Sequence, residues 1–325
     1  MPELRLVPRR LLTISPEETK FARRGFRAFD AAVQKRLEEA GASFLLGYHA
    51  ALEPVAPDEL AARLGEIPAE FRGFAFEGAG MSLFLGDRLT LFRRKSRFDC
   101  FLAGPGSSHA YMMHVGAGWA MARLPRSRGR VARALERMHP LLRWLALDGF
   151  GFHEGYFHAG ERVRARRVPA DLGGYQPRAF DQGLGRSLWF VDGADPGRIP
   201  ATIMEFEENR RGDLWSGVGL ACGYAGGLEE SGIARLVDAA GAYVTEFAQG
   251  VAFAAKARES AGNPSVYTER ACRIVWGASA AAAATMTDKA LAGLRHDASE
   301  PAYEHWRRRI QIEMKHRMIP QGVLK

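Results

Sequence analysis

The chain has 325 residues, of which 47% are hydrophobic, so it can bury a substantial core in one large domain or two closely packed ones. Its net charge of +8, from 45 basic and 37 acidic residues, would suit an anionic partner, but the arginines are scattered and no nucleic-acid-reading motif accompanies them. Three cysteines without metal-ligand spacing, no signal peptide and no membrane-length apolar run predict a cytoplasmic protein with no nucleic-acid partner and no integral membrane segment.

Helical signals follow one another along the chain. Ser15-Pro16-Glu17-Glu18 is typical of a helix start, and we expect this helix to run to Ala40 and to end at Gly41. Few runs alternate with period two, which predicts an all-α fold. In chain order we expect helices at 15–40, 44–52, 58–64, 108–124, 131–147, 205–227, 229–240, 243–260 and 267–293, with a charged helix and then coil over 300–325.

The segment 205–227 has a regular pattern of small residues. Its small residues recur at steps of three and four and would share one face of a helix: Gly212, Ser216, Gly219, Gly223 and Gly226. Because each glycine costs about 1 kcal/mol in a helix interior, something must press against that face. Two interpretations stay open, namely close packing against another helix and a cavity for a bulky apolar ligand.

Glycine patterns recur at a nearly constant offset and suggest an internal duplication. The segment 116–120 matches 217–221, and Gly149 with Phe152 matches Gly250 with Phe253, both at an offset of 101 residues. The segment 78–83 matches 183–188 at an offset of 105. We therefore expect two fused pseudo-symmetric helical halves packed through glycine-rich helices. The expected units are an N-terminal segment 1–70, repeats over 71–160 and 178–296, and a charged tail 297–325.

Four stretches, GFHEGYF, DQGLGRSLWFVDGADP, RRGDLWSGVGLACGYAGG and AQGVAFAAKAR, occur in this order over 151–258. Together they resemble the UnbL-type proteins that are encoded alongside enediyne polyketide synthases, within a larger family catalogued as a domain of unknown function. The resemblance spans nearly the whole chain. It implies a role in bacterial polyketide or related natural-product biosynthesis, but no established reaction and no set of catalytic residues.

Familiar catalytic motifs are absent from the sequence, including a nucleophile elbow, a phosphate loop, a dinucleotide fingerprint and a cysteine-pair zinc motif. His153-Glu154 is followed by His158, one residue further than the second histidine of an HExxH zinc helix. On a continuous helix the two imidazoles would diverge by about 140°. These histidines could still bind a metal from a loop.

Four residues are candidates for catalysis: Asp213, His153, Arg186 and Arg210. Asp213 directly follows Gly212, the first of the small residues on the common helix face, which we call the glycine stripe. His153 follows the repeated Phe152, and Arg186 occupies the position that Met81 has in the first repeat. A carboxyl or imidazole in an apolar pocket has a displaced pKa, which would suit proton transfer to or from a polyene. Alternatively, Asp213 forms a buried structural pair with Arg210 or Arg186. The candidates for substrate contact are Gln249, Tyr156, Trp215, Trp189, Gly219 and Gly223.

Three functions stay open. The first is an enzyme without an organic cofactor that folds a long apolar polyene in a helical cavity and isomerises or cyclises it. The second is a non-catalytic carrier or scaffold that shields such a chain for biosynthetic partner proteins. The third is a Mg²⁺-dependent, terpene-cyclase-like enzyme for a prenyl diphosphate, in which Glu205 and Glu208 chelate magnesium while arginines hold the diphosphate. The sequence leaves the substrate and the oligomeric state open.

Overall fold

The computed structural model describes residues 12–90, 95–124, 130–294 and 300–318. Within these ranges it contains sixteen α-helices and no strand, which confirms the expected all-α class. The first half comprises η1 (Pro16–Thr19), α2 (Phe21–Arg24), α3 (Ala31–Leu52), α4 (Pro57–Gly65), α5 (Ala69–Leu89), α6 (Arg97–Ala103), η2 (Ser107–His109), α7 (Ala110–Arg123), α8 (Arg130–Glu136) and α9 (Arg143–Phe157). The second half comprises η3 (Gly160–Arg164), α10 (Gln176–Val191), α11 (Arg198–Met204), α12 (Glu208–Tyr224), α13 (Glu230–Ala240), η4 (Gly241–Tyr243), α14 (Val244–Ala261), α15 (Val266–Trp276), α16 (Ala280–Leu291) and α17 (Ala302–Met318).

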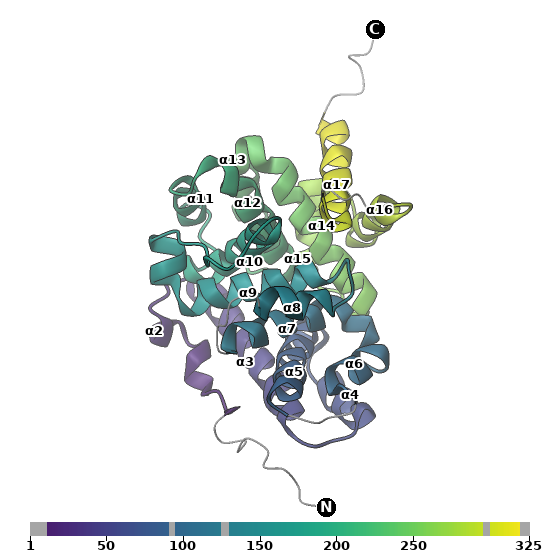
Figure 1. The fold of residues 1–325 in the computed structure, drawn as a ribbon. Coiled ribbons are helices and arrows are strands. Elements are labelled where there is room, and N and C mark those ends of the chain that lie inside the picture. Colours follow the sequence, from purple (N-terminus) through teal and green to yellow (C-terminus); the bar gives the residue numbers. More distant parts are fainter. Residues whose placement is uncertain (1–11, 91–94, 125–129, 295–299, 319–325) are drawn as a thin grey trace, which may run out of the picture.

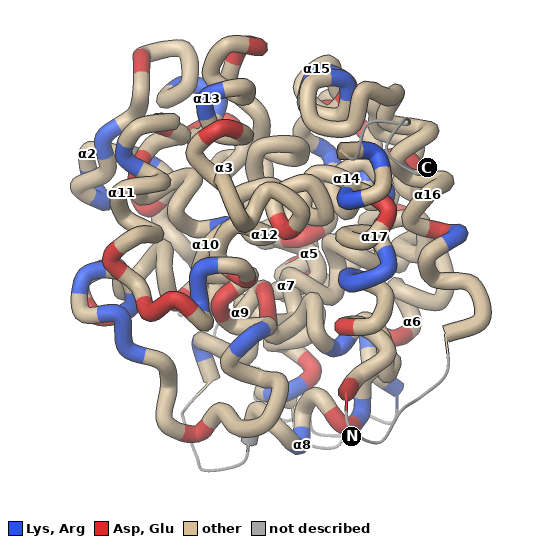
Figure 2. The backbone as a smooth tube through the Cα atoms, turned by 90° about the horizontal axis from the view of Figure 1, so that it is seen from above, with Lys and Arg blue, Asp and Glu red and all other residues tan. Residues whose placement is uncertain are grey.

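Seven helices form a row in which each packs against the next member of the row, and the row follows the order of the sequence. The order is α3, α5, α7, α9, α10, α12 and α14, and α16 and α17 pack against α14. Figure 1 shows this progression from purple α3 and blue α5 near one end of the view to green α14 and yellow α17 near the other. In Figure 2 acidic and basic positions are interspersed around the outline of the tube. None of the described helices is both long enough and apolar enough to cross a membrane.

The helices of the row approach one another at glycines. A Cβ atom at Gly116 of α7 would overlap the carbonyl oxygen of Glu77 on α5, and one at Gly118 would overlap that of Ala146 on α9. The same holds for the glycines that face the preceding helix, Gly78, Gly149, Gly183, Gly217 and Gly250, and for those that face the following helix, Gly151, Gly185 and Gly219. The backbones are thus too close at these points for any side chain. The expected division into two similar halves stays a prediction.

The start of the chain differs from the expectation. No single helix spans 15–40, because the left-handed Gly25 (φ 69°) ends α2, and a new helix begins after Asp30. The Asp30 carboxylate accepts a 2.8 Å hydrogen bond from the Val33 amide, which caps α3. Gly41 lies inside α3 and does not end it. Tertiary packing against α5 therefore outweighs the unfavourable helix propensity of glycine here.

Further boundaries differ from the expectation. The helix expected at 44–52 lies in the second half of α3. The helix expected at 131–147 is interrupted between α8 and α9, in a stretch that contains Pro140, which has no amide hydrogen to donate. The helix expected at 267–293 is divided by the left-handed Gly277 (φ 60°) into α15 and α16. α12 ends at Tyr224, so Gly226 (φ 67°) lies beyond the helix on which we expected it.

Candidate functional site

A pocket walled by aromatic side chains opens between the N-terminal segment and α3, α5, α7, α9 and α10. Its cavity volume is about 50 Å³. We call it the aromatic pocket, after the residues Phe44, Phe74, Trp119, Phe152, Tyr156, Phe157 and Phe190 that line it. The walls are therefore suited to an apolar ligand.

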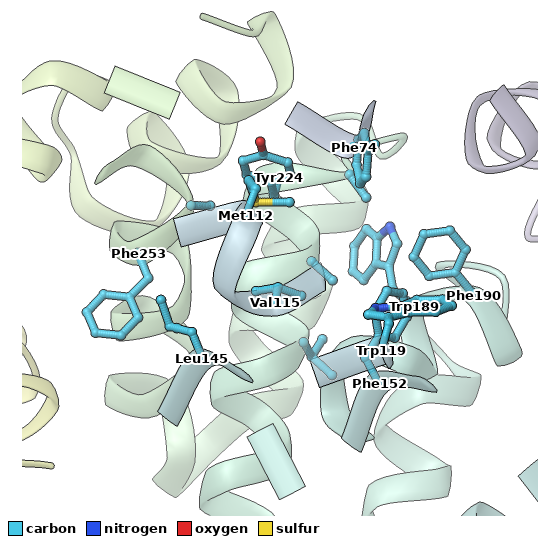
Figure 3. Close-up of a cluster of buried hydrophobic side chains, with 14 of the residues drawn as sticks. Phe74, Met112, Val115, Trp119, Leu145, Phe152, Trp189, Phe190, Tyr224 and Phe253 are labelled. Atoms are coloured by element: carbon cyan, nitrogen blue, oxygen red, sulfur yellow. The ribbon is translucent and has the colours of Figure 1, made fainter. Parts of the chain in front are cut away.

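The aromatic rings of this pocket pack against one another. The ring centre of Trp119 lies 4.7 Å from that of Phe44 and 5.1 Å from that of Phe152, with an edge-to-face arrangement in the second pair. Phe152 and Phe190 follow at 5.4 Å. Figure 3 shows Trp119, Phe152 and Phe190 gathered on one side of the hydrophobic cluster. Such contacts add stabilisation beyond burial and fix the orientation of the rings.

One buried acid, Glu77, lies in the wall of this pocket. It precedes Gly78 on α5, at the point where α5 meets α3, and only 1% of its surface is exposed. Its Oε1 atom has no hydrogen-bond partner among the described residues. Burial raises the pKa of Glu77 to about 7, while the charge of Arg186 opposes the shift and that of Asp148 adds to it. Glu77 can therefore hold or release a proton near neutral pH.

Arg186 and Asp148 complete a buried charge cluster with Glu77. Arg186 Nη1 lies 2.9 Å from Asp148 Oδ1, and Arg186 Nη2 lies 3.7 Å from Glu77 Oε1. The guanidinium also lies over the ring of Phe152, 4.8 Å from its centre. Burial raises the pKa of Asp148 to about 6, against the attraction of Arg186. The two carboxyl groups share Arg186, and Arg307 also lowers the pKa of Asp148, so their protons are coupled and the cluster can retain one of them near neutrality.

A second apolar pocket, of about 30 Å³, lies beyond the charge cluster. It is lined by Arg186 together with Met112, Val115, Leu145, Tyr224, Phe253 and Trp306. Figure 3 shows Leu145 and Phe253 on the side of the hydrophobic cluster away from Trp119 and Phe190. Because Glu77 lines one pocket and Arg186 the other, the 3.7 Å contact between them links the two.

The sequence candidates separate into those at the aromatic pocket and those elsewhere. Arg186 belongs to the charge cluster, and Tyr156 lines the pocket. His153 is buried behind the wall, with its ring centre 5.5 Å from that of Trp119.

Asp213 and Gln249 lie in a different buried network, centred on Arg307 of α17. Arg307 Nη1 lies 2.8 Å from Asp213 Oδ1, and Arg307 Nε donates to Gln249 Oε1 at 3.0 Å. Arg178 Nε donates to Asp213 Oδ2 at 2.8 Å. The buried pairing of Asp213 was anticipated, but the partners named for it, Arg210 and Arg186, were wrong. The central cation of this network therefore comes from α17, within the segment that we expected to be a charged tail.

The other candidates make packing or pairing contacts. Arg210 forms a two-point salt bridge with Asp181, and Trp189 Nε1 donates to the Gly226 carbonyl at 2.9 Å. Trp215 packs against Phe247, with 6.0 Å between ring centres. Two stripe glycines, Gly219 and Gly223, face α14. The neighbouring helix therefore fills the space in which we had considered a cavity.

The acidic pair considered for magnesium is divided between two elements. Glu205 lies at the end of α11, where its carboxylate contacts Arg166 at 2.9 Å, and Glu208 begins α12. Both side chains are exposed. The interruption between the helices removes the i, i+3 relation on which the pairing depended.

Sequence reasoning missed Glu77, Asp148 and Trp119 as site residues, although the sequence carried a usable pattern. Glu77 is the one charged residue in the apolar run FAFEGAGMSLFL. Asp148 precedes Gly149 just as Glu77 precedes Gly78. A charged residue beside a glycine that must touch a neighbouring helix is forced into the interior.

No curated protein and no solved structure matches the chain. A family model does, over residues 3–314, and its family is described as "Protein of unknown function (DUF1702)". Because the match covers nearly the whole sequence, the chain belongs to the DUF1702 family.

Proposed function

We propose that this protein binds an elongated apolar molecule in the aromatic pocket and moves a proton on it through Glu77, so that the molecule is isomerised or cyclised without an organic cofactor. The observation that carries the proposal is the position of Glu77, a buried carboxyl group in an otherwise largely apolar wall, whose Oε1 atom has no hydrogen-bond partner among the described residues. Burial there raises its pKa to about 7. The biosynthetic context, bacterial polyketide or enediyne-like natural products, rests on the resemblance to UnbL-type proteins.

The chemistry follows from the charge cluster. The Glu77 O–H bond breaks as a C–H bond forms on an alkene carbon, and Arg186 stabilises the carboxylate that remains. The faces of Trp119 and Phe152 attract the positive charge that develops on the neighbouring carbon. Loss of a different proton to a carboxylate of the cluster restores the double bond at a new position, or after ring closure. Protons and charge balance without any other reactant.

The proposed ligand is slender. A cavity volume of about 50 Å³ accommodates only a few water-sized groups, so a long chain would enter with movement of the ring side chains. The second pocket, which Arg186 lines, offers further apolar surface.

We further propose that the row of helices arose from a unit of one helix and its connection. In six helices of the row, the glycine that faces the preceding helix, here called the first glycine, lies at position 78, 116, 149, 183, 217 or 250. These positions follow one another at intervals of 33 to 38 residues. The offsets of 101 and 105 each span three such intervals, so the two similar halves would be a consequence of this shorter repeat. The residue before the first glycine is polar in five of the six helices: Glu77, Asp148, Gln182, Ser216 and Gln249. The repeat would thus supply the row of polar side chains from which the charge cluster is built.

Binding is tested with a fluorescent conjugated polyene such as parinaric acid. Excitation of tryptophan should transfer energy to a polyene bound beside Trp119, and mass spectrometry of the extracted probe should detect a shifted or cyclised double-bond system. Glu77→Gln should bind the probe and lose turnover. Asp181→Asn is the matched control, because Asp181 is also a buried acid whose pKa burial raises to about 6, but it pairs with Arg210 away from the aromatic pocket. Equal turnover in Glu77→Gln and the wild type would refute the proposal.

A carrier or scaffold is the second candidate, favoured by the predominance of apolar side chains in the wall of the aromatic pocket. Tight binding of polyenes with no product in any assay would identify it. The magnesium-dependent cyclase of a prenyl diphosphate is the third, and the separation of Glu205 and Glu208 between α11 and α12 weighs against it. It would require turnover that EDTA abolishes, release of diphosphate, and loss of both in Glu205→Gln or Glu208→Gln.

A further inference from the structure

The carboxyl-terminal end of α9 gathers three metal-ligating side chains, His153, Glu154 and His158. His153 Nδ1 lies 3.8 Å from Glu154 Oε1, and His158 Nε2 lies 3.9 Å from the same oxygen. The three ligand atoms all lie within 4.8 Å of one another. His158 is the capping residue just beyond α9, where its backbone leaves the helical path (φ −124°, ψ 37°). This departure brings together two imidazoles that a continuous helix would keep apart.

The buried histidine of this group has no other hydrogen-bonding role. His153 is 4% exposed, and neither of its ring nitrogens has a hydrogen-bond partner among the described residues. A buried polar atom without such a partner is costly, and a bound ligand would offset that cost. The ring is held between Trp119, at 5.5 Å, and Phe157, at 4.7 Å.

The carboxylate is fixed from its other side. Arg162, from the turn η3 that follows α9, donates from Nε to Glu154 Oε2 at 2.8 Å. Oε1 is the oxygen nearest the two imidazoles. An outer partner that orients a ligating carboxylate is a regular feature of metal sites.

We propose that His153, Glu154 and His158 bind one divalent transition-metal ion of the zinc type. Two neutral imidazoles and one carboxylate form the donor set of open zinc and iron sites, in which further positions are left to water or substrate. Ligand atoms around tetrahedral zinc lie roughly 3.3 Å apart, so binding requires a contraction of the group. His158 can supply most of it, because its side chain is 51% exposed and can rotate, and the 3.8 Å distance between His153 Nδ1 and Glu154 Oε1 has to shorten by about 0.5 Å.

Two pockets are lined by residues that lie next to the proposed ligands in the sequence. Phe157 and Tyr156 line the aromatic pocket and also a polar pocket of about 390 Å³ that includes Ala159 and Gly160. The three proposed ligands themselves line neither pocket. The inference is independent of the proton-transfer role of Glu77.

The test uses full-length protein treated with a chelator and desalted. All variants carry Cys100→Ser, which removes the exposed thiol as a competing ligand. Titration with Zn²⁺ by calorimetry, and with Co²⁺ by visible absorption, should give one equivalent. His158→Ala should weaken binding at least about 100-fold, and it should leave the melting temperature of the metal-free protein unchanged because the side chain is half exposed.

His316→Ala is the matched control, since His316 is an exposed histidine on α17. It should bind zinc as the Cys100→Ser parent does. His153→Gln should also fail to bind the ion, which would identify His153 as the buried ligand. The proposal is overturned if the parent protein binds no zinc or cobalt, or if His158→Ala binds them with unchanged affinity.

Discussion

Replacing Gly183 by alanine tests how closely α9 and α10 approach. The added Cβ would overlap the carbonyl oxygen of Asp148, and it would also crowd the amide of Phe152, 2.8 Å away. Both obstacles are backbone atoms of a packed helix, so no side-chain rotation relieves the overlap and the two helices must move apart. The change would also disturb Asp148, a member of the charge cluster.

Overpacking of this kind costs about 1–3 kcal/mol, and sometimes more. Alanine recovers about 1 kcal/mol of helix propensity relative to glycine. Because both obstacles are backbone atoms, the cost should lie at the upper end of this range, and we expect a net loss of about 2 kcal/mol, which for 325 residues corresponds to a fall in melting temperature of about 3 °C. The assay is urea unfolding followed by circular dichroism, together with a thermal scan.

Gly86→Ala is the control, because a Cβ at Gly86 of α5 meets no atom within 4 Å. It should raise stability by about 0.5–1 kcal/mol. If the two variants shift the unfolding midpoint in the same direction and by the same amount, the argument from backbone contact is wrong.

Three more predictions concern buried charges and thiols. Arg307→Met should destabilise the protein by about 3–5 kcal/mol in urea unfolding, because it leaves Asp213 and Glu304 buried without this cation. Lys315→Met, at an exposed position of the same helix, should change stability by less than about 0.5 kcal/mol. Because burial raises the pKa of Glu77 above its unfolded value of 4.5 to about 7, the folded state holds a proton that the unfolded state releases. The contribution of this group to stability should therefore fall as the pH rises from about 5 to 8, and the difference in stability between the wild type and Glu77→Gln should change by at most about 3 kcal/mol over that range, as urea unfolding at each pH would show. Iodoacetamide should modify Cys100 and spare Cys222 and Cys272 in the native protein, as peptide mass spectrometry would show, because the latter two thiols are buried and burial raises the pKa of Cys272 to about 12.

The sequence allowed the all-α class and several helices to be predicted, because helical periodicity and glycine placement are local properties. The expected helices at 229–240 and 243–260 match α13 and α14 closely. The start of the chain was mispredicted in two respects. The left-handed Gly25 ends α2 and Asp30 begins a new helix, and α3 continues past Gly41 while packed against α5.

The candidate site was predictable only in part, since its members come from distant positions. Arg186 was singled out because it broke the internal similarity, and it does lie in the charge cluster. Its partners Glu77 and Asp148 are 109 and 38 positions earlier in the chain, and no local pattern links them to it. Asp213 was placed correctly in the interior, but its cation comes from the tail helix α17, whose docking is set by packing against α14.

The most direct test of the proposed function is a crystal structure of the Glu77→Gln variant grown with a conjugated polyene. We expect the chain of the ligand to lie between Trp119 and Phe190, with a double bond beside the residue-77 side chain and with ring side chains displaced to admit it. Density for the polyene elsewhere on the protein, with the aromatic pocket still closed, would contradict the account.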